Sequence, residues 1–240
     1  IMPKIYKVID KTDNNHIKHP IFDLPFKLAI VGKSQISLGK TSIILNFLLR
    51  KEFYKDLFKG ENIWVITNNK LDNKLKILKD EKDIPDENFL PYDETRLEEI
   101  YDMIEEEFQE EKKKQQRLII FDDVAYSGDL KTKETGIISK IVMNGRHAGL
   151  SSIFTTQKYS LLGTNIRSQL TGAMLGNASL KEIELMNSDL NFLSNPREFM
   201  KLYKKNTQGR DFLVLNFTND NEYYMDKEFN TINTKLDKVD

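Results

Sequence analysis

The segment KLAIVGKSQISLGKTSIILNFLLR, at residues 27–50, decides the fold. Its first five residues form a short apolar run that stops at Gly32, which predicts a buried β-strand. A polar loop follows, and the run from Thr41 to Arg50 is long and regular enough to predict a buried helix. The segment therefore predicts a strand, a loop and a helix in direct succession.

The same succession repeats along the chain. Runs rich in β-branched and aromatic residues predict further strands at 63–67, 118–121, 151–155, 172–176 and 212–217. Apolar spacing predicts helices from Thr95 to about 114, over 137–142, and from Pro196 to about Tyr203. Thr95 and Glu98 have the spacing of a capping box and are expected to begin the first of these helices. Residues 70–93 are charged and poorly periodic, so no element is predicted there.

Strands that alternate with helices predict an α/β fold, with a mostly parallel central sheet and helices on both of its faces. A turn signal at 218–221 separates two strand-like runs, so we expect a C-terminal β-hairpin. The chain has no internal repeat and no linker rich in Gly or Ser, which favours a single domain over residues 1–240. Residues 1–25 are expected to be an N-terminal arm and residues 228–240 a C-terminal tail.

Composition excludes several classes of protein. Lys and Arg total 36 and Asp and Glu total 37, so the net charge of -1 leaves no global positive field to attract nucleic acid. There is no Cys, which excludes disulfides, thiolate nucleophiles and thiolate metal sites. Apolar runs stop well short of the ~20 residues that span a bilayer, and the beginning of the chain lacks a signal-peptide core. We therefore expect a soluble protein that is not secreted.

Gly39-Lys40-Thr41 opens the first predicted helix directly after a buried strand, as in a P-loop. Backbone amides at such a helix N-terminus meet anionic phosphates. Lys40 would reach the β- and γ-phosphates of ATP, and Thr41 would offer its hydroxyl to Mg²⁺. The predicted cofactor-binding residues are Gly32, Ser34, Gly39, Lys40, Thr41 and Ser42.

This phosphate loop departs from the usual P-loop pattern. The pattern places a Gly five positions before Gly39, where this chain has Ser34, and the nearest Gly is Gly32. Either Ser34 adopts the turn without the steric freedom of glycine, or the loop carries two additional residues. Both forms are compatible with phosphate binding. Alternatively, Gly39-Lys40-Thr41 only caps an ordinary helix.

An acidic pair follows the strand predicted at 118–121. We expect this strand to lie next to the P-loop strand, so that Asp122 faces the magnesium shell, through a water molecule. Asp123 is then placed to polarise the attacking water. A strand that simply ends at an Asp-rich turn is the alternative. The two motifs together predict a RecA-like P-loop NTPase core that binds ATP and Mg²⁺.

Four motifs in this order resemble the FtsK–HerA superfamily, and most closely the poxvirus-type genome-packaging ATPases of large DNA viruses and virophages. They are Gly39-Lys40-Thr41, Asp122-Asp123, Asn144-Gly145-Arg146-His147 and Phe154-Thr155-Thr156-Gln157. The resemblance covers roughly residues 27–178. The chain departs from it in the irregular loop before Gly39 and in Asp123, where relatives outside the viral branch usually have Glu.

The resemblance implies an oligomeric ring, a pentamer or a hexamer, that hydrolyses ATP and drives double-stranded DNA into a preformed capsid. It implies that Gln157 senses the γ-phosphate and that Arg146 reaches the nucleotide of a neighbouring subunit; Arg167 competes for the second role. Capsid proteins would be partners, and the protein would work in the host cytoplasm or a viral factory, or with the virion.

DNA contact is predicted in the loop from Val124 to Glu134. Its Lys131 and Lys133 follow the acidic pair and could grip the phosphate backbone without reading sequence, several copies acting together in a ring. An ordinary exposed loop would carry the same lysines. Two other functions stay open: a P-loop kinase of a small acceptor, and a nucleotide-gated assembly or adaptor protein that does not hydrolyse ATP.

Overall fold

The computed structural model describes residues 16–33, 39–69, 72–111, 114–124, 136–193, 195–218 and 224–234. Its strands are β1 (Lys27–Val31), β2 (Ile63–Thr67), β3 (Phe89–Leu90), β4 (Arg117–Asp122), β5 (Leu150–Thr156), β6 (Gly172–Leu175), β7 (Leu213–Asn216) and β8 (Tyr224–Met225). Its α-helices are α1 (Lys40–Leu49), α2 (Asn73–Lys82), α3 (Glu94–Glu110), α4 (Ile137–Asn144), α5 (Thr164–Gln169), α6 (Leu180–Leu190) and α7 (Pro196–Asn206).

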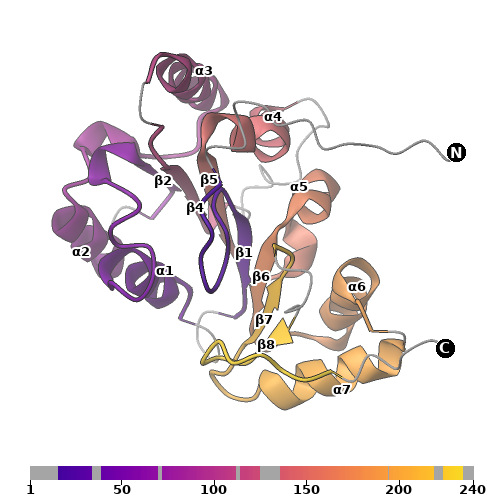
Figure 1. The fold of residues 1–240 in the computed structure, drawn as a ribbon. Coiled ribbons are helices and arrows are strands. Elements are labelled where there is room, and N and C mark those ends of the chain that lie inside the picture. Colours follow the sequence, from indigo (N-terminus) through magenta and orange to yellow (C-terminus); the bar gives the residue numbers. More distant parts are fainter. Residues whose placement is uncertain are drawn as a thin grey trace, which may run out of the picture.

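The strands form one eight-stranded sheet in the order β3-β2-β4-β5-β1-β6-β7-β8 (Figure 1). The six strands from β3 to β6 are parallel, and β7 and β8 extend the sheet in antiparallel fashion. The prediction of a mostly parallel α/β sheet is confirmed, as is the antiparallel pairing of the last two strands. Parallel strands place their carboxyl ends at one edge, which we call the carboxyl edge; the opposite edge is the amino edge.

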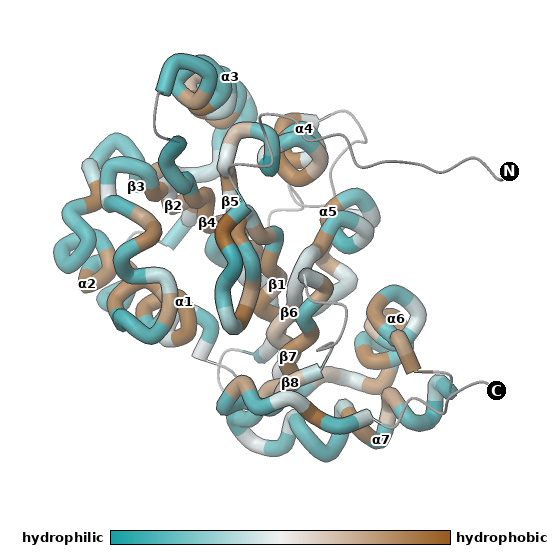
Figure 2. Tube along the Cα trace, viewed as in Figure 1, coloured by the Kyte–Doolittle hydropathy of each residue, from teal (hydrophilic) through white to brown (hydrophobic). Residues whose placement is uncertain are grey.

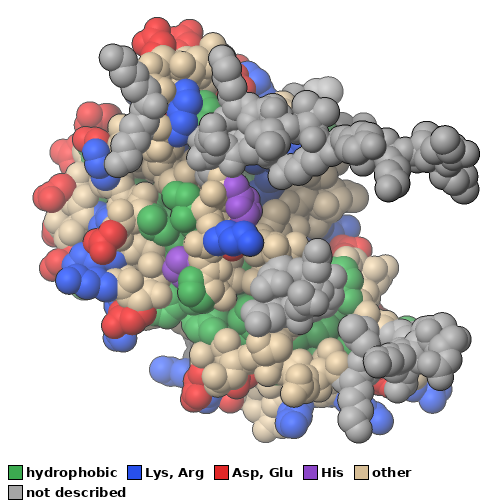
Figure 3. Space-filling model, viewed as in Figure 1, with side chains coloured by type: hydrophobic (Ala, Val, Ile, Leu, Met, Phe, Trp, Pro, Cys, Tyr) green, Lys and Arg blue, Asp and Glu red, His purple; other side chains and the backbone are tan. Residues whose placement is uncertain are grey.

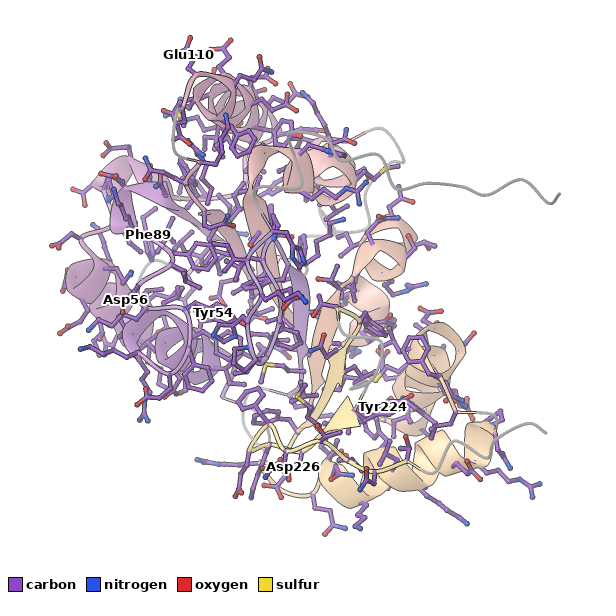
Figure 4. All side chains as sticks on the ribbon, in the orientation of Figure 1. Tyr54, Asp56, Phe89, Glu110, Tyr224 and Asp226 are labelled. Atoms are coloured by element: carbon purple, nitrogen blue, oxygen red, sulfur yellow. The ribbon has the colours of Figure 1, made fainter. Side chains whose placement is uncertain are left out.

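Two apolar layers cover the sheet. Alternate strand residues pack on one side against α1 and α2, and on the other against α3 to α7. Figure 2 shows the same division, with hydrophobic central strands and hydrophilic outer surfaces on α2 and α3. Figure 4 places Tyr54 in the first layer and Tyr224 beside α6 and α7 in the second. Helices on both faces explain why the central strands are apolar runs rather than alternating ones.

One expectation about strand order is wrong. The strand that ends in Asp122 does not lie next to the P-loop strand, because β5 pairs with both β1 and β4 and lies between them. Local patterns identify a strand but do not choose its neighbours, which depend on how the crossover helices pack.

Other differences are local. The structure adds α2, β3, α5 and α6, which the sequence did not predict, and begins α3 at the side chain of Asp93 rather than at Thr95. In α2 only Leu75 and Leu78 are buried, so its apolar pattern is too sparse to recognise. Phe22 and Leu24, in the expected N-terminal arm, are fully buried. Among the described helices, none is long and apolar enough to cross a membrane.

Candidate active site

The described ends of the predicted phosphate loop, Gly32 and Gly39, follow β1 and precede α1. The Gly32 amide donates to the carbonyl of Thr156 at 3.0 Å, which joins this end of β1 to β5. Helix α1 begins at Lys40 directly after Gly39, and its first turn contains no acidic residue. The amides of a first helical turn have no partner within the helix, and the helix dipole favours negative charge there. This end of α1 therefore suits an anion.

Lys40 and the acidic pair come together across β5. The Lys40 ammonium is buried and donates to the Gly32 carbonyl at 3.3 Å. It also lies 3.5 Å from Oδ1 of Asp123. Asp123 has a left-handed backbone, with φ of 50°, which Asp tolerates better than most residues. The lysine and the aspartates thus share one site although about eighty residues separate them in the sequence.

Thr155 in the middle strand holds the acidic pair in place. Its hydroxyl donates to Oδ1 of Asp122 at 2.8 Å and accepts from the amide of Asp123 at 3.0 Å. Burial, together with the charge of Asp123, raises the pKa of Asp122 to about 6 against the lowering effect of the Thr155 hydrogen bond. Sequence reasoning did not assign Thr155, because its role depends on the register that pairs it with Asp122.

Helix α2 contributes two more side chains to this end of the sheet. Lys74 donates from Nζ to Oγ of Ser42 at 2.7 Å. Asp72 caps α2 by accepting from the amides of Lys74 and Leu75, and its charge adds to the raised pKa of Asp122. The capping pattern at Asp72 was a usable signal that the sparse apolar spacing of α2 concealed.

The remaining predicted residues occupy different places. Gln157 is exposed and directly follows β5 at the carboxyl edge, within the same group of strand ends. Arg146 is exposed in the short helix Gly145–Ala148, which precedes β5 at the amino edge. Thr41 is half-buried in the first turn of α1. Ser34, Lys131 and Lys133 lie outside the described residues.

The donor set fits a magnesium ion that is shared with phosphate. The described residues contain no group of three or more His, Asp or Glu that could enclose a metal alone. Mg²⁺ in phosphate sites needs only one or two protein ligands, because water and phosphate oxygens supply the rest. A cation near Asp122 would favour the ionised carboxylate that burial disfavours.

Comparison with solved structures identifies proteins with a similar fold. The genome packaging NTPase B204 from Sulfolobus turreted icosahedral virus 2, in complex with AMPPCP, aligns with a TM-score of 0.60 and 15% identity, over 90% of this chain and 100% of that one. B204 from Sulfolobus Turreted Icosahedral Virus gives 0.59 and 14% identity, over 87% and 98%. The pCW3 conjugation coupling protein TcpA, with ATPgS, gives 0.50 and 12% identity, over 79% and 57%.

The mostly parallel sheet, with Lys40, Asp122 and Asp123 together at its carboxyl edge, has the RecA-like fold of P-loop ATPases. Residues 14–218 match the model of the poxvirus A32 protein family, and the chain belongs to that family. The predicted resemblance to poxvirus-type members of the FtsK–HerA superfamily is therefore confirmed. No curated protein matches the chain.

Proposed function

We propose that this ATPase is an ATP-driven translocase that packages double-stranded viral DNA into a preformed capsid, as a ring with ATP hydrolysed between subunits. The observation that carries the proposal is the 3.5 Å approach of Lys40 to Asp123, beside the buried Asp122. The likeness of the fold to proteins described as genome packaging NTPases supports it. A site of this kind binds and hydrolyses a triphosphate rather than building a covalent intermediate.

Each residue of the site has a role in this proposal. Amides after Gly39 and the Lys40 ammonium would bind the β- and γ-phosphates, and Thr41 and Asp122 would hold Mg²⁺, Asp122 through water. When bound, the ion would neutralise charge on the phosphates. Asp123 orients a water molecule for attack on the γ-phosphorus, and the bond to the β–γ bridging oxygen breaks. Gln157 can donate to a phosphate oxygen and accept from water.

Arg146 is the better candidate for an arginine that acts on a neighbouring subunit. Arg167 is already engaged, since its Nε lies 2.8 Å from Asp189 and its Nη1 donates to the carbonyl of Leu162 at 3.0 Å. Arg146 is exposed and has no carboxylate partner among the described residues. It lies at the amino edge, so its own subunit's phosphates are out of reach.

Phosphate release with and without duplex DNA tests the proposed function. We expect ATP hydrolysis that DNA stimulates and that rises with protein concentration, because the active site needs a neighbour. Turnover that requires a small acceptor would instead identify a kinase, and binding without turnover at any concentration would identify an adaptor. Lys131→Ala and Lys133→Ala should weaken DNA binding and reduce its salt dependence while basal hydrolysis continues.

A further inference from the structure

Lys27 is a largely buried lysine that has no anionic partner in the part of the chain that the structure describes. It opens β1 at the amino edge, with only 8% of its surface exposed. Its backbone bonds to Thr171, but within the described residues its ammonium has no hydrogen bond and no ion pair. Burial, together with the nearby Arg146 guanidinium, lowers the pKa of Lys27 to about 8. Only the stem of the side chain is enclosed, because the Nζ atom keeps some exposed surface, so the ammonium is open to an anion from outside the subunit.

Arg117 is a buried cation at the same edge, and it has anionic partners. Arg117 opens β4 and is 1% exposed. Its guanidinium lies 2.6 Å from Glu111 and 3.1 Å from Glu107. Figure 3 shows acidic side chains gathered over α3, which carries Glu107, whereas the middle of that face has few of them. The fold thus neutralises Arg117 internally and leaves Lys27 and Arg146 with no described carboxylate.

An anion that binds Lys27 cannot belong to the nucleotide of the same subunit. Lys27 begins β1, and Gly32 and Lys40 follow the other end of that strand. Five strand residues separate the two edges by about 15 Å, at roughly 3.3 Å per residue. Any phosphate bound at α1 therefore lies across the sheet from Lys27.

We propose that Lys27 and Arg146 together bind the nucleotide phosphates of a second copy of this chain. The inference rests on the proposed function, and it adds Lys27 as a second residue acting on the neighbouring site. The carboxyl edge presents a triphosphate and the amino edge presents two cations, so copies complement one another head to tail. Such heterologous contacts close into rings when the rotation allows.

A DNA backbone is a poorer occupant of this surface. Sequence-independent DNA grip uses exposed lysines and arginines along a groove, whereas Lys27 is only 8% exposed as a residue, so a single group can reach no more than the tip of its side chain. Lys27 would donate N–H bonds to a non-bridging phosphate oxygen and keep its protons. Hydrolysis itself stays the attack of water on the γ-phosphorus with departure of the bridging oxygen.

A subunit-mixing experiment tests the proposal. Lys27→Met should retain binding of a non-hydrolysable ATP analogue by single subunits but lose at least tenfold in turnover, and Lys40→Ala should lose turnover because its own site is damaged. In a one-to-one mixture of the two variants, about one interface in four joins the intact nucleotide site of a Lys27→Met subunit to the intact amino edge of a Lys40→Ala subunit. We therefore expect up to about a quarter of wild-type turnover. If Lys27 acted within its own subunit, mixing would restore nothing.

Controls separate the possible failures. Lys51→Met removes an exposed charge elsewhere and should leave turnover unchanged. Lys27→Arg should keep most of the turnover, because the charge is retained. Particle mass should rise when the analogue is added to wild type and rise less for Lys27→Met. Lack of restoration on mixing, or full activity of Lys27→Met, overturns the proposal, as does a DNA-binding defect with normal basal turnover. Absence of turnover in wild type would refute the proposed function instead.

Discussion

The two edges of the sheet treat their buried cations differently. At the carboxyl edge, Lys40 lies 3.5 Å from Asp123 and bonds to the Gly32 carbonyl, so the site is assembled within one chain. At the amino edge, Arg117 is paired with glutamates, but Lys27 has no described anion beside it. Pairing within the subunit preorganises a site. A cation that has no anion within its own subunit stays available to an anion from another subunit. The carboxyl edge is thus the part that one subunit completes alone.

Among the substitutions that test this difference between the edges, the largest loss of turnover is expected for Arg146. If the amino edge completes a neighbour's site, Arg146→Ala should lower turnover by about 10³- to 10⁵-fold while ATP binding stays close to wild type. Nucleotide titration measures ATP binding and phosphate release measures turnover, both on the same sample. Turnover within threefold of wild type would exclude Arg146. Arg167→Ala is the comparison variant, and its loss should appear mainly as reduced stability.

Thr155 tests the preorganisation of the carboxyl edge. Thr155→Val keeps the shape but removes the hydroxyl that bonds to Asp122 and Asp123. We expect turnover or apparent Mg²⁺ affinity to fall about 10- to 100-fold, as when an outer partner of a metal ligand is lost. A Mg²⁺ titration of turnover measures this, and Thr155→Ser should recover most of it. Unchanged Mg²⁺ dependence in Thr155→Val would show that Asp122 needs no such support.

The difference between the two edges should also appear in the free energy of unfolding when Lys27 is replaced. The pKa of Lys27 in the folded chain, about 8, lies below the ordinary value of 10.5. The unfolded chain therefore binds more protons between these values, so stability rises with pH through that window. Lys27→Met should raise the free energy of unfolding at pH 7 by roughly 1–3 kcal/mol and lose this advantage above pH 10.5.

Urea denaturation of nucleotide-free subunits at both pH values checks the prediction for Lys27. The exposed Lys51 provides the matched control, since Lys51→Met should change stability little at either pH. Lower stability of Lys27→Met at pH 7 would mean that the ammonium is already paired in the free subunit.

The smallest effect is expected at the exposed bond between Lys74 and Ser42. Lys74→Met should cost about 0.5–1 kcal/mol of stability, because an exposed charged hydrogen bond is largely screened by solvent. Thermal unfolding without nucleotide measures it. If Lys74→Met instead reduced turnover tenfold, α2 would have to be included in the catalytic arrangement of the carboxyl edge.

The sequence alone was enough to predict most of the strands, four of the helices and the candidate residues of the main site. Residues 27–50 were sufficient to predict β1 and α1, because hydrophobic periodicity and turn residues are local signals. The same signals pointed to Lys40 and Asp122, since each residue type follows a recognisable strand end.

Only the tertiary structure decided which side chains meet. It placed β5 between β1 and β4, and this register brings Thr155 to Asp122. It also buried most of Lys27 near Arg146 without a described carboxylate, and a count of the charged residues in the sequence could not indicate this. Strand order and the pairing of buried charges depend on contacts between residues distant in the sequence, and local patterns carry no information about those contacts.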